Sequence, residues 1–214
     1  MTNKQNEEKI KIVLIGESGV GKTSIISQFV DSKFDEDRQA TTAGVYTSSI
    51  VKCDDDKMIH LQIWDTAGQE VYRSITKLFY TNTSVVLFVY DITDKSSFVA
   101  LKSYWVEEVK KTLSQNIIYL LIANKSDLYD NEQVSDDEGT NFAKEIGATF
   151  YMVSAKNKEC IDRVFLDIAK IYAKSEEAEI VKKKTENFEF VRMKKDTVKL
   201  KSQTLKKKKK NCCK

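Results

Sequence analysis

The stretch Gly16-Glu17-Ser18-Gly19-Val20-Gly21-Lys22-Thr23 decides the fold of this chain. An apolar run, Ile10–Ile15, precedes it and predicts a buried parallel strand. Apolar residues at helical spacing follow it, between Ile25 and Val30. A strand, a glycine-rich loop and a helix, in this order, form the context in which the pattern G-x-x-x-x-G-K-[ST] binds phosphate groups. The stretch therefore predicts a site for a nucleoside triphosphate.

The chemistry of this loop follows from its residue types. Its glycines let the backbone approach an anion closely, so that successive N–H groups and the helix dipole act on the phosphate oxygens. Lys22 adds a positive charge for the β- and γ-phosphates, and the Thr23 hydroxyl is suited to Mg²⁺. The nucleotide-binding residues predicted here are Ser18, Gly19, Val20, Gly21, Lys22, Thr23 and Ser24.

The rest of the chain alternates strand-like and helix-like patterns, and 214 residues suffice for one α/β domain with a tail. Further strands are predicted over 45–53, 58–64, 85–90, 117–123 and 149–153, and further helices over 71–80, 96–113, 134–146 and 161–172. This alternation predicts a mostly parallel sheet with helices on both faces. Ligands bind such sheets at the carboxyl ends of the strands.

Two of these strand ends carry residues suited to the phosphate chemistry and to recognition of the base. Asp65 directly follows the run 58–64, where a carboxylate can hold Mg²⁺, and Gly68 and Gln69 can contact the γ-phosphate and orient a water molecule. Asn124-Lys125-Ser126-Asp127 follows the run 117–123. A carboxylate at Asp127 can accept from both N1–H and the 2-amino group of guanine, which adenine cannot offer.

The remaining base contacts come from the Lys125 stem, which can pack on the base, and from Ser154-Ala155-Lys156 after the run 149–153. A backbone N–H of this second segment can bind the guanine O6. Each segment alone is a weak signal, but their order behind the glycine-rich loop is specific. The expected nucleotide is GTP, with GDP as product and Mg²⁺ as cofactor.

From Lys9 to about Lys174 the chain resembles the small GTPases of the Ras superfamily, and within them the Rab family. The features typical of Rab proteins are Trp64-Asp65-Thr66-Ala67-Gly68-Gln69-Glu70, Tyr72-Arg73-Ser74-Ile75-Thr76, Val89-Tyr90-Asp91-Ile92-Thr93 and a pair of cysteines near the end. The resemblance implies the three-layer P-loop small-GTPase fold, α/β, with a mostly parallel six-stranded sheet. It implies a GTP-binding domain over 9–174, between a flexible N-terminus, 1–8, and a variable tail, 175–214.

The resemblance also implies residue roles in two switch segments, Asp35–Tyr46 and Gly68–Tyr80. Phe34 matches the aromatic residue that packs on guanine. Thr42 matches the threonine that closes on Mg²⁺ and the γ-phosphate, and Thr41 stays a second candidate because the interval after Phe34 is one residue longer than usual. Thr47 stands where the family has the phenylalanine of a surface aromatic cluster, and no role is assigned to Arg38.

Charge is divided unevenly along the chain. The chain has 35 basic and 32 acidic residues. The tail from Lys182 to Lys214 contains 14 of the basic and 3 of the acidic residues, and the rest of the chain contains 21 basic and 29 acidic residues. An acidic body argues against nucleic-acid binding by the fold. The polar first ten residues and the lack of a long apolar run predict neither a signal peptide nor a membrane span, and four cysteines suggest no disulfide framework.

The tail combines a lysine run, Lys206–Lys210, with the adjacent pair Cys212 and Cys213. This ending is similar to the double-cysteine endings of Rab proteins, which receive two geranylgeranyl groups. Two lipid chains anchor a protein stably where one is marginal, and nearby lysines are attracted to the anionic cytoplasmic leaflet. We expect a lipid-anchored protein on the cytoplasmic face of an intracellular membrane, with a cytosolic pool.

The function implied is a molecular switch that hydrolyses GTP slowly and recruits effectors to a membrane in vesicle trafficking. Its implied partners are an exchange factor, a GTPase-activating protein, effectors, a prenylation escort and a GDP-dissociation inhibitor, and we expect a monomer. Gln69 is the predicted catalytic residue. One alternative is a GTP-locked membrane scaffold with little turnover, and another is a P-loop kinase or ATPase, which the guanine-specific role of Asp127 disfavours.

Overall fold

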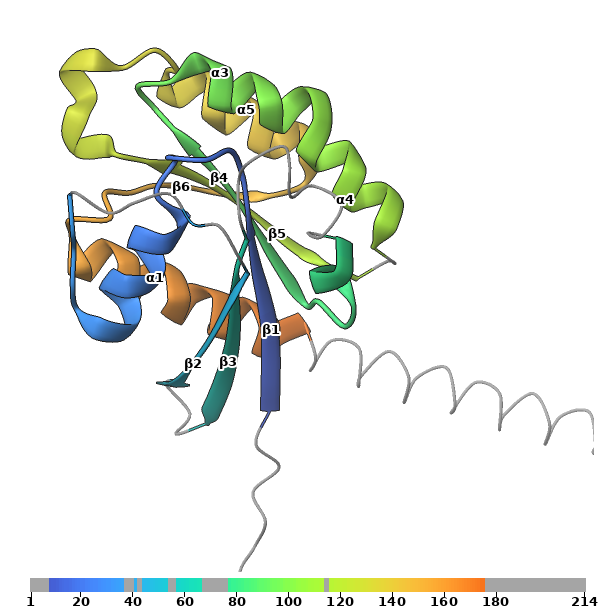
Figure 1. The fold of residues 1–214 in the computed structure, drawn as a ribbon. Helices are drawn as coiled ribbons and strands as arrows, with labels where there is room; N and C mark the ends of the chain where they lie inside the picture. Colours follow the sequence, from blue (N-terminus) through green and yellow to red (C-terminus); the bar gives the residue numbers. More distant parts are fainter. Residues whose placement is uncertain are drawn as a thin grey trace, which may run out of the picture. The chain divides into compact units, whose positions relative to one another are not determined.

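The computed structural model describes residues 8–36, 41, 44–53, 57–66, 77–113 and 116–175. The chain divides into two units, residues 1–170 and 171–214. The first unit contains the whole sheet (Figure 1), and the described part of the second, residues 171–175, is helical. None of the helices in the described ranges has the length and hydropathy needed to cross a bilayer.

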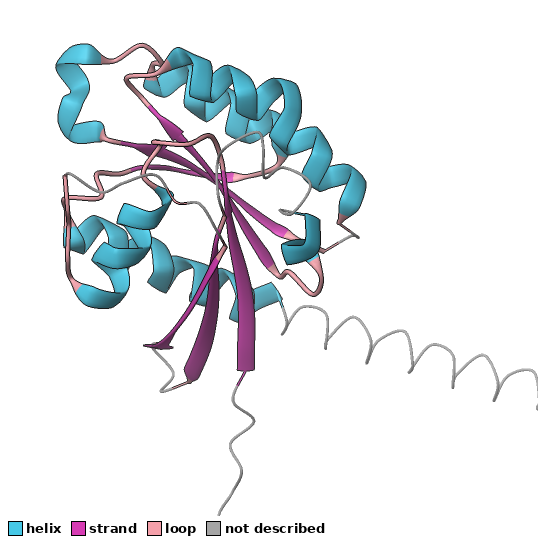
Figure 2. Cartoon of the chain, viewed as in Figure 1, coloured by secondary structure: helices cyan, strands magenta, loops and turns pink. Residues whose placement is uncertain are grey.

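Six strands form a single sheet in the order β2-β3-β1-β4-β5-β6. Their bounds are β1 (Glu8–Ile15), β2 (Val45–Lys52), β3 (Met58–Asp65), β4 (Val85–Asp91), β5 (Ile118–Asn124) and β6 (Thr149–Met152). Only β2 is antiparallel to its neighbour; the other pairs are parallel. The predicted mostly parallel six-stranded sheet with helices on both faces is thus confirmed (Figure 2).

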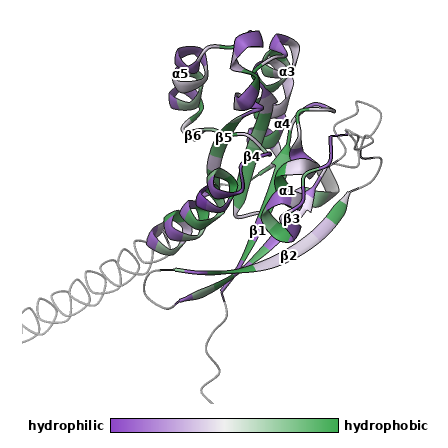
Figure 3. Ribbon diagram, turned by 90° about the vertical axis from the view of Figure 1, so that its left-hand side faces the viewer, coloured by the Kyte–Doolittle hydropathy of each residue, from purple (hydrophilic) through white to green (hydrophobic). Residues whose placement is uncertain are grey.

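Helices cover both faces of this sheet (Figure 1). On one face lie α1 (Lys22–Asp31) and a helix over residues 158–170, whose Phe29 and Phe165 rings stack with centroids 3.9 Å apart. On the other lie α3 (Lys95–Ala100), α4 (Val106–Thr112) and α5 (Asp136–Ile146). All seven residues of β4 are buried between these layers, and Figure 3 shows the central strands coloured as hydrophobic.

The segment predicted as one helix over 96–113 is helical but not uniform. A π-helical turn, η3 (Leu101–Trp105), separates α3 from α4. Apolar periodicity does not reveal such a turn, because it adds less than one residue per turn to a pattern that stays apolar on the same face. The turn places Leu101 and Trp105 in the core.

Helix boundaries follow local chemistry. α5 begins at Asp136, two residues later than predicted, because Ser135 and Glu138 form a reciprocal capping box. Two 3₁₀ segments, η2 (Lys77–Tyr80) and η4 (Ser126–Asn131), complete the described elements. The predicted helix over 71–80 is described only as η2, and η4 was not predicted.

The carboxyl ends of the strands bring the polar residues of the sequence analysis to one edge of the sheet. Asp65, Asp91 and Asn124 are the last residues of β3, β4 and β5. Asp65 lies opposite Leu14 of β1, and Asp91 lies opposite Asn124. Because neighbouring parallel strands end together, residues far apart in sequence meet at this edge.

Candidate functional site

The glycine-rich loop between β1 and α1 is shaped by two glycines that accept no side chain. Gly16 has φ +155°, and a Cβ there would lie 2.1 Å from the carbonyl oxygen of Val89 in β4. Gly21 caps α1 with φ +93°, and a Cβ there would lie 2.3 Å from Nδ2 of Asn124. The loop therefore packs directly against the ends of β4 and β5.

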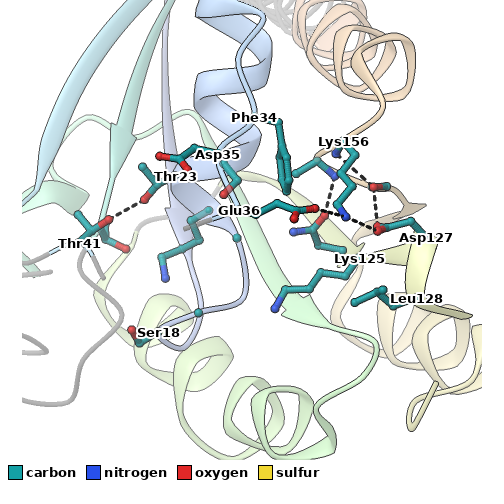
Figure 4. A pocket seen from close by; sticks show the side chains of 18 residues that line it. Ser18, Thr23, Phe34, Asp35, Glu36, Thr41, Lys125, Asp127, Leu128 and Lys156 are labelled. Carbon is teal, nitrogen blue, oxygen red and sulfur yellow. Dashed lines mark hydrogen bonds and ion pairs between the residues drawn. The ribbon is translucent and has the colours of Figure 1, made fainter. Parts of the chain in front are cut away.

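A cavity of about 500 Å³ opens beside this loop (Figure 4). Most of the predicted binding residues line it: Ser18, Gly19, Gly21, Lys22, Thr23, Ser24, Phe34, Asn124, Lys125, Asp127, Ser154, Ala155 and Lys156. Asp35, Glu36, Thr66 and Leu128, which were not predicted, line it too. Val20 and Asp65 do not line the cavity, but each is hydrogen-bonded to a residue that does: Val20 to Asn124, and Asp65 to Thr23.

At the phosphate end of the cavity, Lys22 is held by the loop itself. Its ammonium group donates to the carbonyl oxygens of Gly16 and Glu17, at 2.8 Å each. Burial lowers the pKa of Lys22 to about 8, and the carboxylates of Asp65 and Glu17 act in the opposite direction. The loop thus keeps a buried cation beside the cavity, where phosphate groups can replace the carbonyl partners.

Three oxygens from separate elements meet next to this lysine. The Thr23 hydroxyl donates to Oδ2 of Asp65 at 2.5 Å and lies 2.6 Å from the Thr41 hydroxyl. Asp65 is only 2% exposed, which is costly for a carboxylate without strong partners. Hydroxyl and carboxylate oxygens are the ligands that Mg²⁺ takes, so these residues fit a magnesium ion.

At the opposite end of the cavity, Asn124 joins three loops. Its Nδ2 donates to the carbonyl oxygen of Val20 at 2.8 Å, and its Oδ1 accepts from the backbone N–H of Ala155 at 3.1 Å. The side chain is 1% exposed. One buried amide therefore connects the phosphate loop to both segments predicted to contact the base.

The predicted base-binding carboxylate, Asp127, is held by the second of those segments. Ser154 Oγ donates to its Oδ1 at 2.6 Å, and the Lys156 ammonium lies 3.5 Å from its Oδ2. Burial acts to raise the pKa of Asp127, but the bond from Ser154 and the charge of Lys156 outweigh it and lower that pKa. Asp127 is therefore ionised at neutral pH, as an acceptor for two N–H donors must be.

Two lysines frame the base end of the cavity. Lys125 has a left-handed backbone, φ +65°, and its ammonium pairs with Oδ2 of Asp91 at 2.5 Å. Lys156 pairs with Glu36 at 2.7 Å and lies 5.5 Å from the centroid of the Phe34 ring (Figure 4). The loop after α1 is thus connected to the base-binding segments, which the sequence alone did not indicate.

A surface cluster of three aromatic rings lies on β2, β3 and η2. Tyr46 and Phe79 lie 5.2 and 5.3 Å, centroid to centroid, from the ring of Trp64. The resemblance to Rab proteins predicts the aromatic position at Thr47, and this prediction is wrong. Thr47 lies opposite Ile63, whereas Tyr46 lies opposite Trp64, so alternation along the strand puts Tyr46 and not Thr47 on this face.

Several predicted residues lie outside the described part of the chain: Thr42, Gly68, Gln69, Cys212 and Cys213. Their roles remain predictions. Of the two candidate threonines for Mg²⁺, only Thr41 is described, and its hydroxyl lies 2.6 Å from that of Thr23. Thr41 lies one residue before Thr42, just as Tyr46 lies one residue before Thr47, so the same one-residue offset from the family pattern applies to both.

A comparison with protein-family models matches residues 11–174 to the family described as the Ras family. The match begins in β1 and covers the glycine-rich loop, the oxygen cluster and both base-binding segments. Members of this family bind and hydrolyse GTP, which agrees with the buried lysine at one end of the cavity and the ionised Asp127 at the other. The chain belongs to the Ras family of small GTPases.

Proposed function

We propose that this Ras-family GTPase is a Rab-like switch, which recruits effectors to a membrane in vesicle trafficking when GTP is bound. The observation that carries the proposal is the aromatic cluster of Tyr46, Trp64 and Phe79. It joins β2, whose first two residues end the first switch segment, to η2, which ends the second. Tyr46 is 48% exposed, so a partner that contacts the cluster senses both switch segments at once.

The cluster has a direct test. Tyr46→Ala should abolish capture of GTP-dependent partners from an extract of the protein's own cells, with the GTP affinity unchanged. Thr47→Ala is the matched control, because Thr47 lies on the other face of β2 and should leave capture intact. Equal capture by the parent and the Tyr46→Ala variant would contradict the proposed surface.

Thr41 is proposed as the switch threonine that binds Mg²⁺ together with Thr23 and Asp65. Its hydroxyl lies 2.6 Å from that of Thr23, and the same one-residue offset puts Tyr46 in the aromatic position. When bound, Mg²⁺ neutralises charge on the phosphates. Thr41→Ala should therefore weaken the dependence of GTP affinity on Mg²⁺ concentration, and Thr42→Ala should not. The opposite result would assign the ion to Thr42.

Hydrolysis depends mainly on positioning and charge. Lys22 holds a positive charge against the β- and γ-phosphates, the loop N–H groups bind their oxygens, and Asp127 fixes the base. Gln69 is proposed to orient the attacking water molecule. We expect slow turnover without an activating protein, on the order of 10⁻⁴ s⁻¹ as in a family member with the same parts.

Phosphate release in a single turnover tests this mechanism. Gln69→Leu should slow hydrolysis with GTP binding retained. If the parent also hydrolyses GTP as slowly as Gln69→Leu, even with an activating protein present, the alternative of a GTP-locked scaffold is favoured. Hydrolysis by Gln69→Leu at the parent's rate would remove the catalytic role of Gln69.

Attachment to the cytoplasmic face of an intracellular membrane is proposed to depend on lipid at Cys212 and Cys213. The body outside the basic tail carries 21 basic and 29 acidic residues, so an anionic leaflet repels it. The run Lys206–Lys210 attracts the protein, but only within a Debye length of the surface. Replacing both cysteines by serine should move the protein from the membrane pellet to the soluble fraction without changing its GTP affinity. Retention in the pellet would contradict lipid anchoring.

A further inference from the structure

The phosphate-binding loop contains an acidic residue, Glu17, whose charge opposes the ligand that the loop is built to hold. Ser18 and Gly19, which directly follow it, line the cavity, but Glu17 does not. Its backbone carbonyl accepts from Lys22, so the residue itself cannot move out of the loop. Only the direction of its side chain keeps the carboxylate away from the phosphates.

That direction is set by a contact with the helical layer. Trp105 Nε1 donates to Oε1 of Glu17 at 2.8 Å, across 88 residues of sequence. The indole ring is 1% exposed and packs edge-on against Tyr104, with ring centroids 5.1 Å apart. A buried indole N–H needs an acceptor, and a carboxylate is a strong one. The bond therefore holds both partners.

The π-helical turn places the tryptophan for this contact. Trp105 is the last residue of η3, and the wider turn changes the direction of every side chain that follows α3. Trp105 also belongs to the same hydrophobic cluster as Val106, Val109 and Tyr80, the last residue of η2. The ring is thus buried in the core, while its N–H group bonds to Glu17.

We propose that Trp105 is a positioning residue for nucleotide binding: its indole N–H holds the Glu17 carboxylate on the helical side of the loop, away from the phosphate cavity. The inference rests on the proposed binding of GTP in that cavity. A carboxylate released toward the cavity repels a triphosphate more than a diphosphate, because the triphosphate carries more negative charge. Charge, rather than loss of shape, is therefore the property that Trp105 controls.

The charge can be removed without disturbing the tryptophan, which gives a specific rescue. Trp105→Phe keeps an aromatic ring in the core but deletes the donor, and should lower GTP affinity about tenfold and GDP affinity less. Glu17→Gln keeps an acceptor oxygen for the indole but removes the charge, so its own GTP affinity is the reference for the double variant. On this background Trp105→Phe should change GTP affinity by no more than about twofold, because a neutral amide does not repel phosphates.

Two controls separate this role from a loss of core packing. Phe142→Leu removes aromatic surface from the same hydrophobic cluster without reaching the loop, and should leave the ratio of GTP to GDP affinities unchanged. The indole cross-peak of Trp105 in a ¹H–¹⁵N spectrum should have a different chemical shift in Glu17→Ala than in the parent. This second measurement holds even where Trp105→Phe folds poorly.

The outcomes are distinct. The inference alone is overturned if the parent binds GTP but Trp105→Phe leaves both nucleotide affinities unchanged. It is also overturned if Trp105→Phe lowers the GTP and GDP affinities equally and Glu17→Gln does not restore them. An indole cross-peak that stays in place in Glu17→Ala also overturns it. A parent that fails to bind GTP overturns the proposed function, and the positioning role with it.

Discussion

Asn124→Ala should both destabilise the protein and speed the release of nucleotide. The substitution leaves the carbonyl oxygen of Val20 and the backbone N–H of Ala155 without their side-chain partner. Both of these residues are at least 96% buried, and each unsatisfied backbone group costs about 1–3 kcal/mol. We therefore expect the free energy of unfolding to fall by about 2–6 kcal/mol.

Part of this loss should appear at the nucleotide site, because the two bonds connect the phosphate loop to the segments that contact the base. If about 2 kcal/mol of it is felt there, dissociation of GDP speeds up by about 30-fold. Urea unfolding with excess GDP and Mg²⁺ measures the first effect, and release of a fluorescent GDP analogue measures the second. Asn131→Ala, on the exposed side of η4, is the matched control and should change stability by less than about 0.5 kcal/mol.

A variant that stays within about 1 kcal/mol of the parent, with an unchanged rate of release, would refute the reasoning. It would mean that water or a small backbone shift satisfies both groups. A large loss of stability with no change in release would show that the two bonds stabilise the fold without connecting the loops.

Two further substitutions test packing and the tail. Gly139→Ala in α5 places a Cβ 2.5 Å from the buried hydroxyl of Tyr90, so overpacking should outweigh the gain in helix propensity and lower stability by about 1 kcal/mol in urea unfolding. The control Asn141→Ala is exposed in the same helix and should stabilise the protein. A stabilised Gly139→Ala variant would show that the core side chains move to accommodate the added methyl group. Replacing Lys206–Lys210 by glutamine should weaken membrane attachment in fractionation without abolishing it, and full release would mean that charge, not lipid, is the anchor.

Much of the fold could be predicted because its central strand is buried on both faces. A parallel strand such as β4, with seven buried residues, is a continuous apolar run in the sequence. The glycine-rich loop was equally clear, since Gly16 and Gly21 occupy conformations and contacts that exclude a side chain. These features depend on residue types at fixed spacing, which a sequence displays directly.

Contacts between distant segments could not be predicted in the same way. Thr41 and Thr42 are adjacent and chemically identical, so residue type does not separate them, and the proposal of Thr41 rests on its hydroxyl, which lies 2.6 Å from that of Thr23. The bond between Glu17 and Trp105 depends on a π-helical turn that leaves no periodic signal. The sequence offered one indirect sign, a tryptophan on the apolar face of a helix, whose N–H group needs a partner.

The same limit applied to the base end of the cavity. The sequence predicted Asp127 and Lys156 as separate contacts for guanine. The structure shows that Lys156 also pairs with Glu36, at 2.7 Å, from a loop with no periodic pattern of its own. Glu36 lies in the loop after α1 and Lys156 in the loop after β6. The sequence patterns of α1 and β6 predict where each loop begins but not the path that it takes.

The nucleotide preference of Asp127→Asn tests the central claim most directly. The parent should bind GTP far more tightly than ATP or xanthosine triphosphate, measured by competition against a labelled guanine nucleotide. In the variant an amide donor faces the 2-amino group of guanine, whereas it matches the 2-oxo group of xanthine. GTP affinity should therefore fall by about 100-fold and xanthosine triphosphate should become the preferred ligand. Equal GTP affinity in the variant and the parent would contradict the assignment of this cavity to a guanine nucleotide.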